Sequence, residues 1–158
     1  MDNPRLYPIG DILHNTDINF SNLLSARFKE FDVTPEQWLL LHSLSANDGI
    51  NQKELSARVG KNQTIVTRML DILERKGCVE RKPAPADRRA FLVCITDKGL
   101  ELQKQLLAVE EKTVKAVLKD ILPEKLDTFI QICNKINEST EGIIREFKNH
   151  KVSCPRFE

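Results

Sequence analysis

The sequence predicts a mainly α-helical domain with one small β-hairpin, and three observations support this fold class. The chain has 158 residues, which is the length of one domain and enough to bury a hydrophobic core. Apolar residues recur at helical spacing over most of the chain. The segment 78–96 alternates instead and is rich in β-branched residues. Because no repeat or low-complexity linker interrupts the pattern, residues 1–158 are expected to form a single domain.

The N-terminal part predicts two helices. Residues 8–31 carry apolar side chains three and four apart, as one long amphipathic helix does. Thr34 and Pro35 then suit the cap and the first position of a second helix, and Gln37 completes a capping box. Residues 38–44 are apolar on nearly every side. A helix of this kind is typical of the centre of a core.

Two short helices joined by a glycine turn follow. Asn51 and Asn62 are placed to cap them, and Gly60 ends the first one. Gly77 stands where the second helix needs a left-handed C-terminal residue. Helix, tight turn and helix in this order are the layout of a helix-turn-helix motif.

The β-hairpin is expected next to this motif, with a long tip. The two halves flank residues 82–89, a segment that Pro83 and Pro85 would stiffen and from which Arg88 and Arg89 would project. Residues 49–51 can add a short third strand. Residues 34–96 are therefore predicted to be a winged helix-turn-helix lobe in which the hairpin is the wing.

The remaining helices carry more apolar positions than a lone winged lobe needs. Thr96 caps a long helix, and Pro123 starts another, so that residues 98–147 hold two helices. We expect these and residues 8–31 to be the dimerisation helices of a two-fold homodimer. The alternative is a monomeric six-helix bundle. Residues 148–158 are expected to form a flexible tail.

The charge distribution points to a polyanionic partner. The whole chain has a net charge of +1, but residues 51–98 hold 11 Lys and Arg against 6 Asp and Glu, a net charge of +5. A basic middle between acidic flanks favours a local contact with a polyanion. A charged face that only solvates the fold is the alternative interpretation.

The helix that begins near Asn62 has the side chains of a DNA-reading helix. Its buried stripe leaves outward the residues Gln63, Thr64, Thr67, Arg68, Asp71 and Arg75, of which the first four lie in the first turns. These residue types hydrogen-bond base edges, and the N-terminal part of the second helix of such a motif enters the major groove. An arginine on a stiff loop can enter a narrow minor groove, which makes Arg88 and Arg89 further DNA-binding residues. Asp87 can pair with a neighbouring Arg.

Five stretches of the sequence, taken in order, resemble the MarR family of winged helix-turn-helix regulators. They are residues 55–60 (LSARVG), 64–71 (TIVTRMLD), 73–81 (LERKGCVER), 87–90 (DRRA) and 95–99 (ITDKG). The resemblance extends over residues 8–147. It implies a homodimer that binds operator sites in double-stranded DNA, usually as a repressor, and releases them when a small molecule or an oxidant arrives. The two-fold symmetry expected above predicts that such an operator is pseudo-palindromic. The resemblance also implies Gln63, Thr64, Thr67 and Arg68 as recognition-helix residues, and Asp87 and Arg89 as the wing motif.

The resemblance leaves two kinds of release signal open. Members of the family often bind aromatic or phenolic acids between the dimer helices and the DNA-binding lobe, a region near which Trp38 and His42 lie. Core packing is the alternative role for both residues. Cys78 and Cys94 fall on opposite arms of the hairpin, where a disulfide between them would distort the wing. Two small semi-buried side chains without redox function are the alternative.

Other functional classes find no support in the sequence. It lacks the G-x-S-x-G and H-E-x-x-H motifs and a glycine-rich phosphate loop, so no catalytic residue and no cofactor are expected. The three histidines are not clustered, so no metal site is expected. No membrane span or signal peptide is visible, which predicts a cytoplasmic protein without a membrane partner. A winged protein-interaction module that does not bind DNA is the alternative function.

Overall fold

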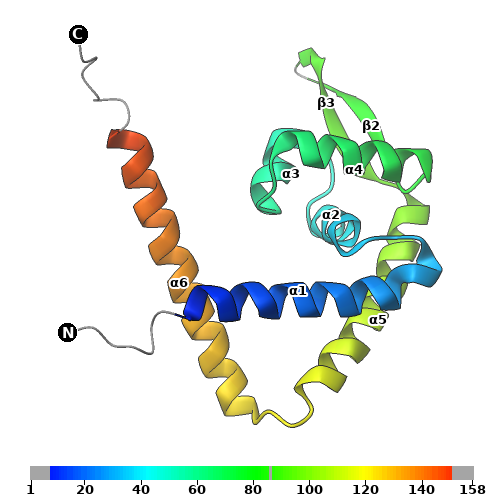
Figure 1. Cartoon of the computed structure of the whole chain (residues 1–158). Coiled ribbons are helices and arrows are strands. Elements are labelled where there is room, and N and C mark those ends of the chain that lie inside the picture. The colour runs from blue at the N-terminus through cyan, green and yellow to red at the C-terminus, as the bar shows by residue number, and fades with distance from the viewer. Residues whose placement is uncertain (1–7, 86, 151–158) are drawn as a thin grey trace. The chain divides into compact units, whose positions relative to one another are not determined.

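The computed structural model describes residues 8–85 and 87–150 and confirms a mainly helical chain with a small sheet (Figure 1). The elements are the helices α1 (Ile9–Phe28), α2 (Pro35–Ala46), α3 (Gln52–Arg58), α4 (Gln63–Arg75), α5 (Asp97–Leu118) and α6 (Pro123–His150), a 3-10 turn η1 (Lys29–Phe31), and the strands β1 (Ile50–Asn51), β2 (Val79–Ala84) and β3 (Asp87–Ile95). Helices α3 and α4 with the β2–β3 hairpin form the arrangement predicted for residues 34–96.

Contacts divide the chain into two compact units, with the boundary between Lys115 and Ala116. The first unit holds α1 to α4, the sheet and most of α5, and the second holds the end of α5 and α6. Helix α6 continues to His150, so residues 148–150 are helical and are not part of a tail. The rest of the predicted tail, residues 151–158, lies outside the described residues.

The predicted helix caps are present and explain why the helices begin where they do. The Thr34 hydroxyl accepts from the Gln37 backbone N–H, and the Gln37 side chain accepts from the Thr34 N–H, both at 3.2 Å. Asn51 and Asn62 each accept, at 2.9 Å, from the backbone N–H three residues further on. These bonds satisfy N–H groups that have no partner inside the helix. They fix the first residue of α2, α3 and α4.

The sheet has the order β1-β3-β2, and its first strand is the short strand predicted near residues 49–51. The prediction of a long hairpin tip at residues 82–89 is wrong, because β2 continues to Ala84 and β3 begins at Asp87. Pro83 is tolerated inside β2 because that strand lies at the sheet edge, where one side needs no N–H donor. The pairs Pro83↔Phe91 and Ala84↔Asp87 leave residues 88–90 of β3 without a counterpart in β2. The hairpin therefore has a bulge instead of a long loop.

Two hydrophobic clusters hold the first unit together. The larger one packs α2, α3, α4 and the sheet, and Val66, Leu70 and Leu73 place the inner side of α4 in it with no exposed surface. The smaller one joins α1, α2 and α5 around Phe28 and Trp38. Because α4 is fixed to the core along its length, its opposite side has a defined direction in space.

Candidate nucleic-acid interface

The outward side of α4 carries the polar residues predicted to read DNA. Gln63, Thr64 and Arg68 are exposed, as predicted, while the apolar stripe of the same helix is buried. Figure 1 shows the β2–β3 hairpin extending beyond α4 in the same lobe. A polar helix face beside a projecting hairpin can meet a groove and the neighbouring backbone of a duplex at the same time.

Thr67 differs from the other predicted residues, because its hydroxyl is already engaged within the protein. The side chain is half-buried. Its Oγ1 accepts from Gln52 Nε2 at 2.5 Å and donates to the Gln63 carbonyl at 2.7 Å. Gln52 Nε2 also lies 3.4 Å from that carbonyl. Thr67 therefore joins α4 to the first turn of α3 and holds the residue that begins the recognition helix.

Sequence reasoning missed two residues of this surface. Gln52 lies three, four and seven residues before Leu55, Ser56 and Val59, and this spacing places it on the inner side of α3, where it can reach α4. Ile65 is 40% exposed in the first turn of α4, although it is apolar. An exposed isoleucine at this position can contact the methyl group of thymine. Ile65 interrupts the otherwise polar face of α4, and this interruption in the sequence could have indicated that Ile65 belongs to the surface.

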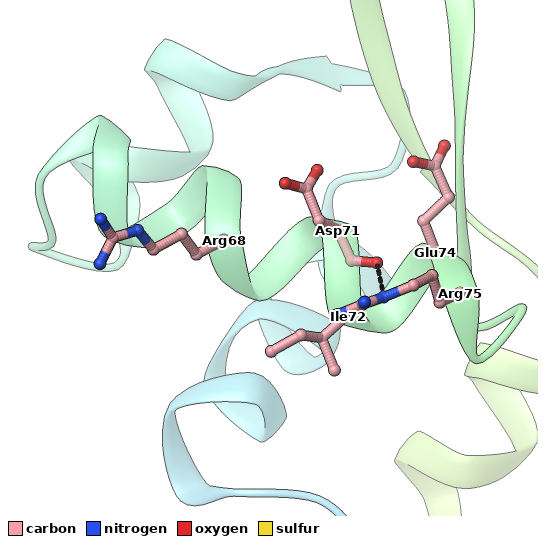
Figure 2. A pocket seen from close by; sticks show the side chains of 5 residues that line it. All are labelled: Arg68, Asp71, Ile72, Glu74 and Arg75. Atoms are coloured by element: carbon pink, nitrogen blue, oxygen red, sulfur yellow. Dashed lines mark hydrogen bonds between the residues drawn. The ribbon is translucent and has the colours of Figure 1, made fainter.

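The second half of the outward face holds acidic as well as basic side chains. A hollow of about 500 Å³ is lined by Arg68, Asp71, Ile72, Glu74 and Arg75, whose side chains Figure 2 shows. Arg68 extends away from Asp71, while the carboxylates of Asp71 and Glu74 rise on one side of α4. Arg75 folds back so that its Nε donates to the Asp71 carbonyl at 3.3 Å. Both carboxylates are ion-paired with Arg81 of β2.

The wing residues Asp87, Arg88 and Arg89 are the first three residues of β3. Arg88 and Arg89 belong to the bulge, where the backbone departs from the regular ladder. Bulges change the direction of the side chains they carry. The side chains of all three lie outside the described residues, so their DNA-binding role stays a prediction.

Trp38 and His42, predicted as ligand-binding residues with core packing as the alternative, have different environments. Trp38 is buried, and its ring meets Phe28 edge-on with centroids 6.2 Å apart. His42 is exposed, with its ring centroid 5.0 Å from that of Trp38. Its Nδ1 lies 3.4 Å from Nε2 of the buried Gln103. Trp38 is therefore a core side chain, whereas the interpretation of His42 as a core residue is wrong.

Cys78 and Cys94 are free thiols that the hairpin does not place opposite each other. Cys94 pairs with Glu80, and Cys78 precedes the first residue of β2. Both side chains are buried, and burial raises the pKa of each thiol above its ordinary value. Nearby Lys98 and Lys76 oppose this rise in the pKa of Cys78 without reversing it. Since the thiolate is the reactive form, both cysteines are poor nucleophiles here.

Two kinds of feature are absent from the part of the chain that the structure describes. No three His, Cys, Asp or Glu side chains there lie together so that they could hold a metal ion. No helix among residues 8–150 with described placement combines the length and apolar character needed to cross a membrane.

Comparison with known proteins identifies the lobe. Residues 33–91 match the model of the MarR family. This segment is a MarR-family domain. Over 82% of its length the chain is similar to solved structures of transcriptional regulators, which confirms the winged helix-turn-helix class.

Two of these structures are of MarR from E. coli. The apo form is 28% identical, covers 82% of this chain and 96% of its own, and has a TM-score of 0.71. A mutant of the same protein in complex with operator DNA is 27% identical, covers 84% and 95%, and has a TM-score of 0.78. The transcriptional repressor CouR, bound to a 23-mer DNA duplex, is 25% identical, covers 82% and 92%, and has a TM-score of 0.76. The likeness thus extends well beyond the MarR-family domain of residues 33–91.

Proposed function

We propose that this protein is a cytoplasmic, sequence-specific DNA-binding transcriptional regulator that acts as a repressor. The observation that carries the proposal is the face of α4, whose polar residues point outward from a helix that is fixed to the core. The DNA complexes of MarR and CouR support it, because both are similar to this chain over more than four-fifths of its length. A bound dimer would cover its operator and so exclude other proteins from it.

Each side chain of the surface has a role that fits its chemistry. Gln63, at the first position of α4, can make two hydrogen bonds with an adenine edge. Arg68, one turn further on, can bind guanine or a phosphate, and Thr64 and Ile65 can contact thymine methyl groups. We assign Arg89 of the wing to the minor groove, where the negative potential attracts guanidinium groups. Asp87 and Arg88 would assist this contact, as the sequence predicts.

We propose that a second copy of the chain supplies the other reading helix. Helix α6 exposes an apolar stripe spaced by 3, 4, 7 and 4 residues: Phe129, Ile132, Ile136, Ile143 and Phe147. A stripe of this spacing is typical of a helix that packs against another helix. A two-fold dimer would bind a pseudo-palindromic operator whose half-sites lie one helical turn apart.

For the release signal, we propose a small aromatic or phenolic ligand in preference to thiol oxidation. The two thiols of the hairpin are buried and have raised pKa values, which disfavours the reactive thiolate. A ligand that binds the DNA-free conformation more tightly would release the operator by shifting the population toward that conformation.

The experiment that tests the proposal compares base reading with backbone binding. An operator is first selected from random duplexes with the purified protein, and its affinity is measured over a series of salt concentrations. We expect a steep fall in affinity as salt rises, because lysine and arginine displace counterions from DNA. Arg89→Ala should weaken binding to all sequences, whereas Gln63→Ala should change the preferred sequence. Absence of sequence-selective binding at every salt concentration would refute the proposal and favour a protein-interaction module.

A further inference from the structure

We propose that Arg81 is a positioning residue for DNA binding, which sets the direction in which the wing leaves the recognition helix. This inference rests on the proposed function and assigns a role to a residue that would not itself contact DNA. The ion pairs of Arg81 in β2 with Asp71 and Glu74 in α4 are the observation behind it. Neither the basic charge of Arg81 nor its place in the hairpin indicated this role in the sequence.

The geometry of these ion pairs fixes two elements to each other. Arg81 Nη2 lies 2.6 Å from Asp71 Oδ1, and Nη1 binds Glu74 Oε2. Asp71 and Glu74 are three residues apart, so their carboxylates stand side by side on one face of α4 (Figure 2). A planar guanidinium that binds two carboxylates has one orientation, which a single point charge would not impose.

The place of Arg81 along β2 makes it the second of two anchors. Val79, two residues earlier, is buried in the core and anchors the base of the strand. The Arg81 side chain is only 24% exposed against α4, whereas Lys82 and Pro83 are exposed. The register changes directly after Pro83. Val93 and Ile95 of β3 are buried in the same core, and Arg81 adds a contact from β2 to α4 at the level of its partner Val93, so that the direction of the distal hairpin also depends on α4.

The consequence concerns the bulge that carries the predicted minor-groove arginine. Arg89 lies in residues 88–90 of β3, which have no counterpart where β2 passes from Pro83 to Ala84. The bulge therefore lies opposite a point of β2 that is only two residues beyond Arg81. If the ion pairs are removed, Arg89 samples more directions, and the entropy lost on DNA binding rises. The effect of Arg81 on affinity should thus depend on the presence of Arg89.

A double-mutant cycle on the full chain tests this dependence. Affinity for the selected operator is measured for the wild type, Arg81→Gln, Arg89→Ala and the double variant. We expect Arg81→Gln to weaken binding about 10-fold, equivalent to about 1.4 kcal/mol, because Arg89 is then less restricted in direction before it binds. In the Arg89→Ala background the same change should weaken binding less than about 3-fold, because the residue being positioned is then absent. Equal losses in both backgrounds would overturn the inference.

Two controls separate positioning from other effects. Asp71→Asn with Glu74→Gln in the Arg81→Gln background removes any repulsion between unpaired carboxylates and DNA. If affinity returns to the wild-type value, charge and not position explains the loss, and the inference is wrong. Arg81→Lys should recover only part of the affinity, and it replaces Arg81→Gln in the cycle if the glutamine variant unfolds. Failure of the wild type to select any operator would instead refute the proposed function.

Discussion

Helices α4 and α6 are both amphipathic, but they show opposite sides to the solvent. In α4 the apolar residues Val66, Leu70 and Leu73 have no exposed surface, and polar side chains face outward. In α6 the apolar residues Phe129 and Ile132 are more than half exposed. The apolar side therefore faces the core in α4 and the solvent in α6.

The difference indicates what kind of partner each helix suits. The apolar side of α4 is already satisfied by its own lobe, so a partner of α4 must bind hydrogen-bonding and charged groups, as DNA does. The apolar side of α6 still has favourable burial to gain, and a second copy of the chain can provide it. Substitutions on the two helices should therefore have different measurable effects.

The largest effect is expected on the buried side of α4. Leu70→Ala should lower the free energy of unfolding by about 2–5 kcal/mol, because it removes buried methyl groups and leaves a cavity under the helix. Ile65→Ala, on the exposed side of the same helix, should change it by less than about 1 kcal/mol. Urea denaturation followed by circular dichroism measures both. Equal losses in the two variants would contradict the orientation of α4 described above.

A charge on the apolar stripe of α6 should have the next largest effect, and it should act on assembly instead of folding. Ile132→Glu would place a carboxylate in an apolar interface, where an unpaired charge is costly. We expect a monomer in light scattering and an operator affinity about 100-fold lower, equivalent to about 2.7 kcal/mol. Asn134→Glu adds the same charge on the other side of α6 and should leave the dimer intact. Loss of the dimer in both variants, or in neither, would refute the proposed interface.

The sequence predicted most of what depends on local interactions. The caps of Thr34, Asn51 and Asn62 depend on residues within three positions, and the structure confirms all of them. Gly77 was expected to adopt a left-handed conformation and has a φ of 71°. The outward direction of Gln63 and Arg68 follows from helical periodicity alone. Features of this kind need no knowledge of distant parts of the chain.

Features that depend on tertiary neighbours were missed. Pro83 indicated a loop, because the sequence does not show that β2 lies at the sheet edge. The register of the hairpin pairs Cys94 with Glu80, so that Cys94 does not face Cys78. The bond from Gln52 to Thr67 joins residues 15 positions apart. Each outcome depends on which segments meet in space, and helical or strand periodicity does not encode that.

A smaller effect is expected for the hydrogen bond between α3 and α4, which helps to hold the polar face of α4 in place. Gln52→Ala and Thr67→Val each remove one partner of the 2.5 Å bond. A double-mutant cycle on the free energy of unfolding should give a coupling of about 1 kcal/mol. Gln52→Ala should also reduce operator affinity, because the carbonyl of Gln63 loses a second contact. A coupling near zero would show that the two side chains act independently.

The smallest effects are expected for the thiols, whose burial differs between the base of the wing and α6. Cys78 and Cys94 are buried with raised pKa values, whereas Cys133 of α6 is half-buried. Iodoacetamide at pH 8 should therefore modify Cys133 before Cys78 and Cys94, as peptide mass spectrometry of quenched samples can show. Because the folded protein holds the thiol protons more tightly than the unfolded chain, the associated stability is complete below the unfolded thiol pKa of about 8.5. It is lost as the pH rises through the folded pKa.

Cys78→Ala serves as the control for this pH dependence, since it removes one of the two thiols whose pKa burial raises. Unfolding curves at pH 7 and pH 10 should differ less for the variant than for the wild type. Rapid alkylation of Cys78 and Cys94 in the folded protein would mean that the hairpin opens readily. The wing would then be a redox-accessible element, and thiol oxidation would replace the aromatic ligand as the better-supported release signal.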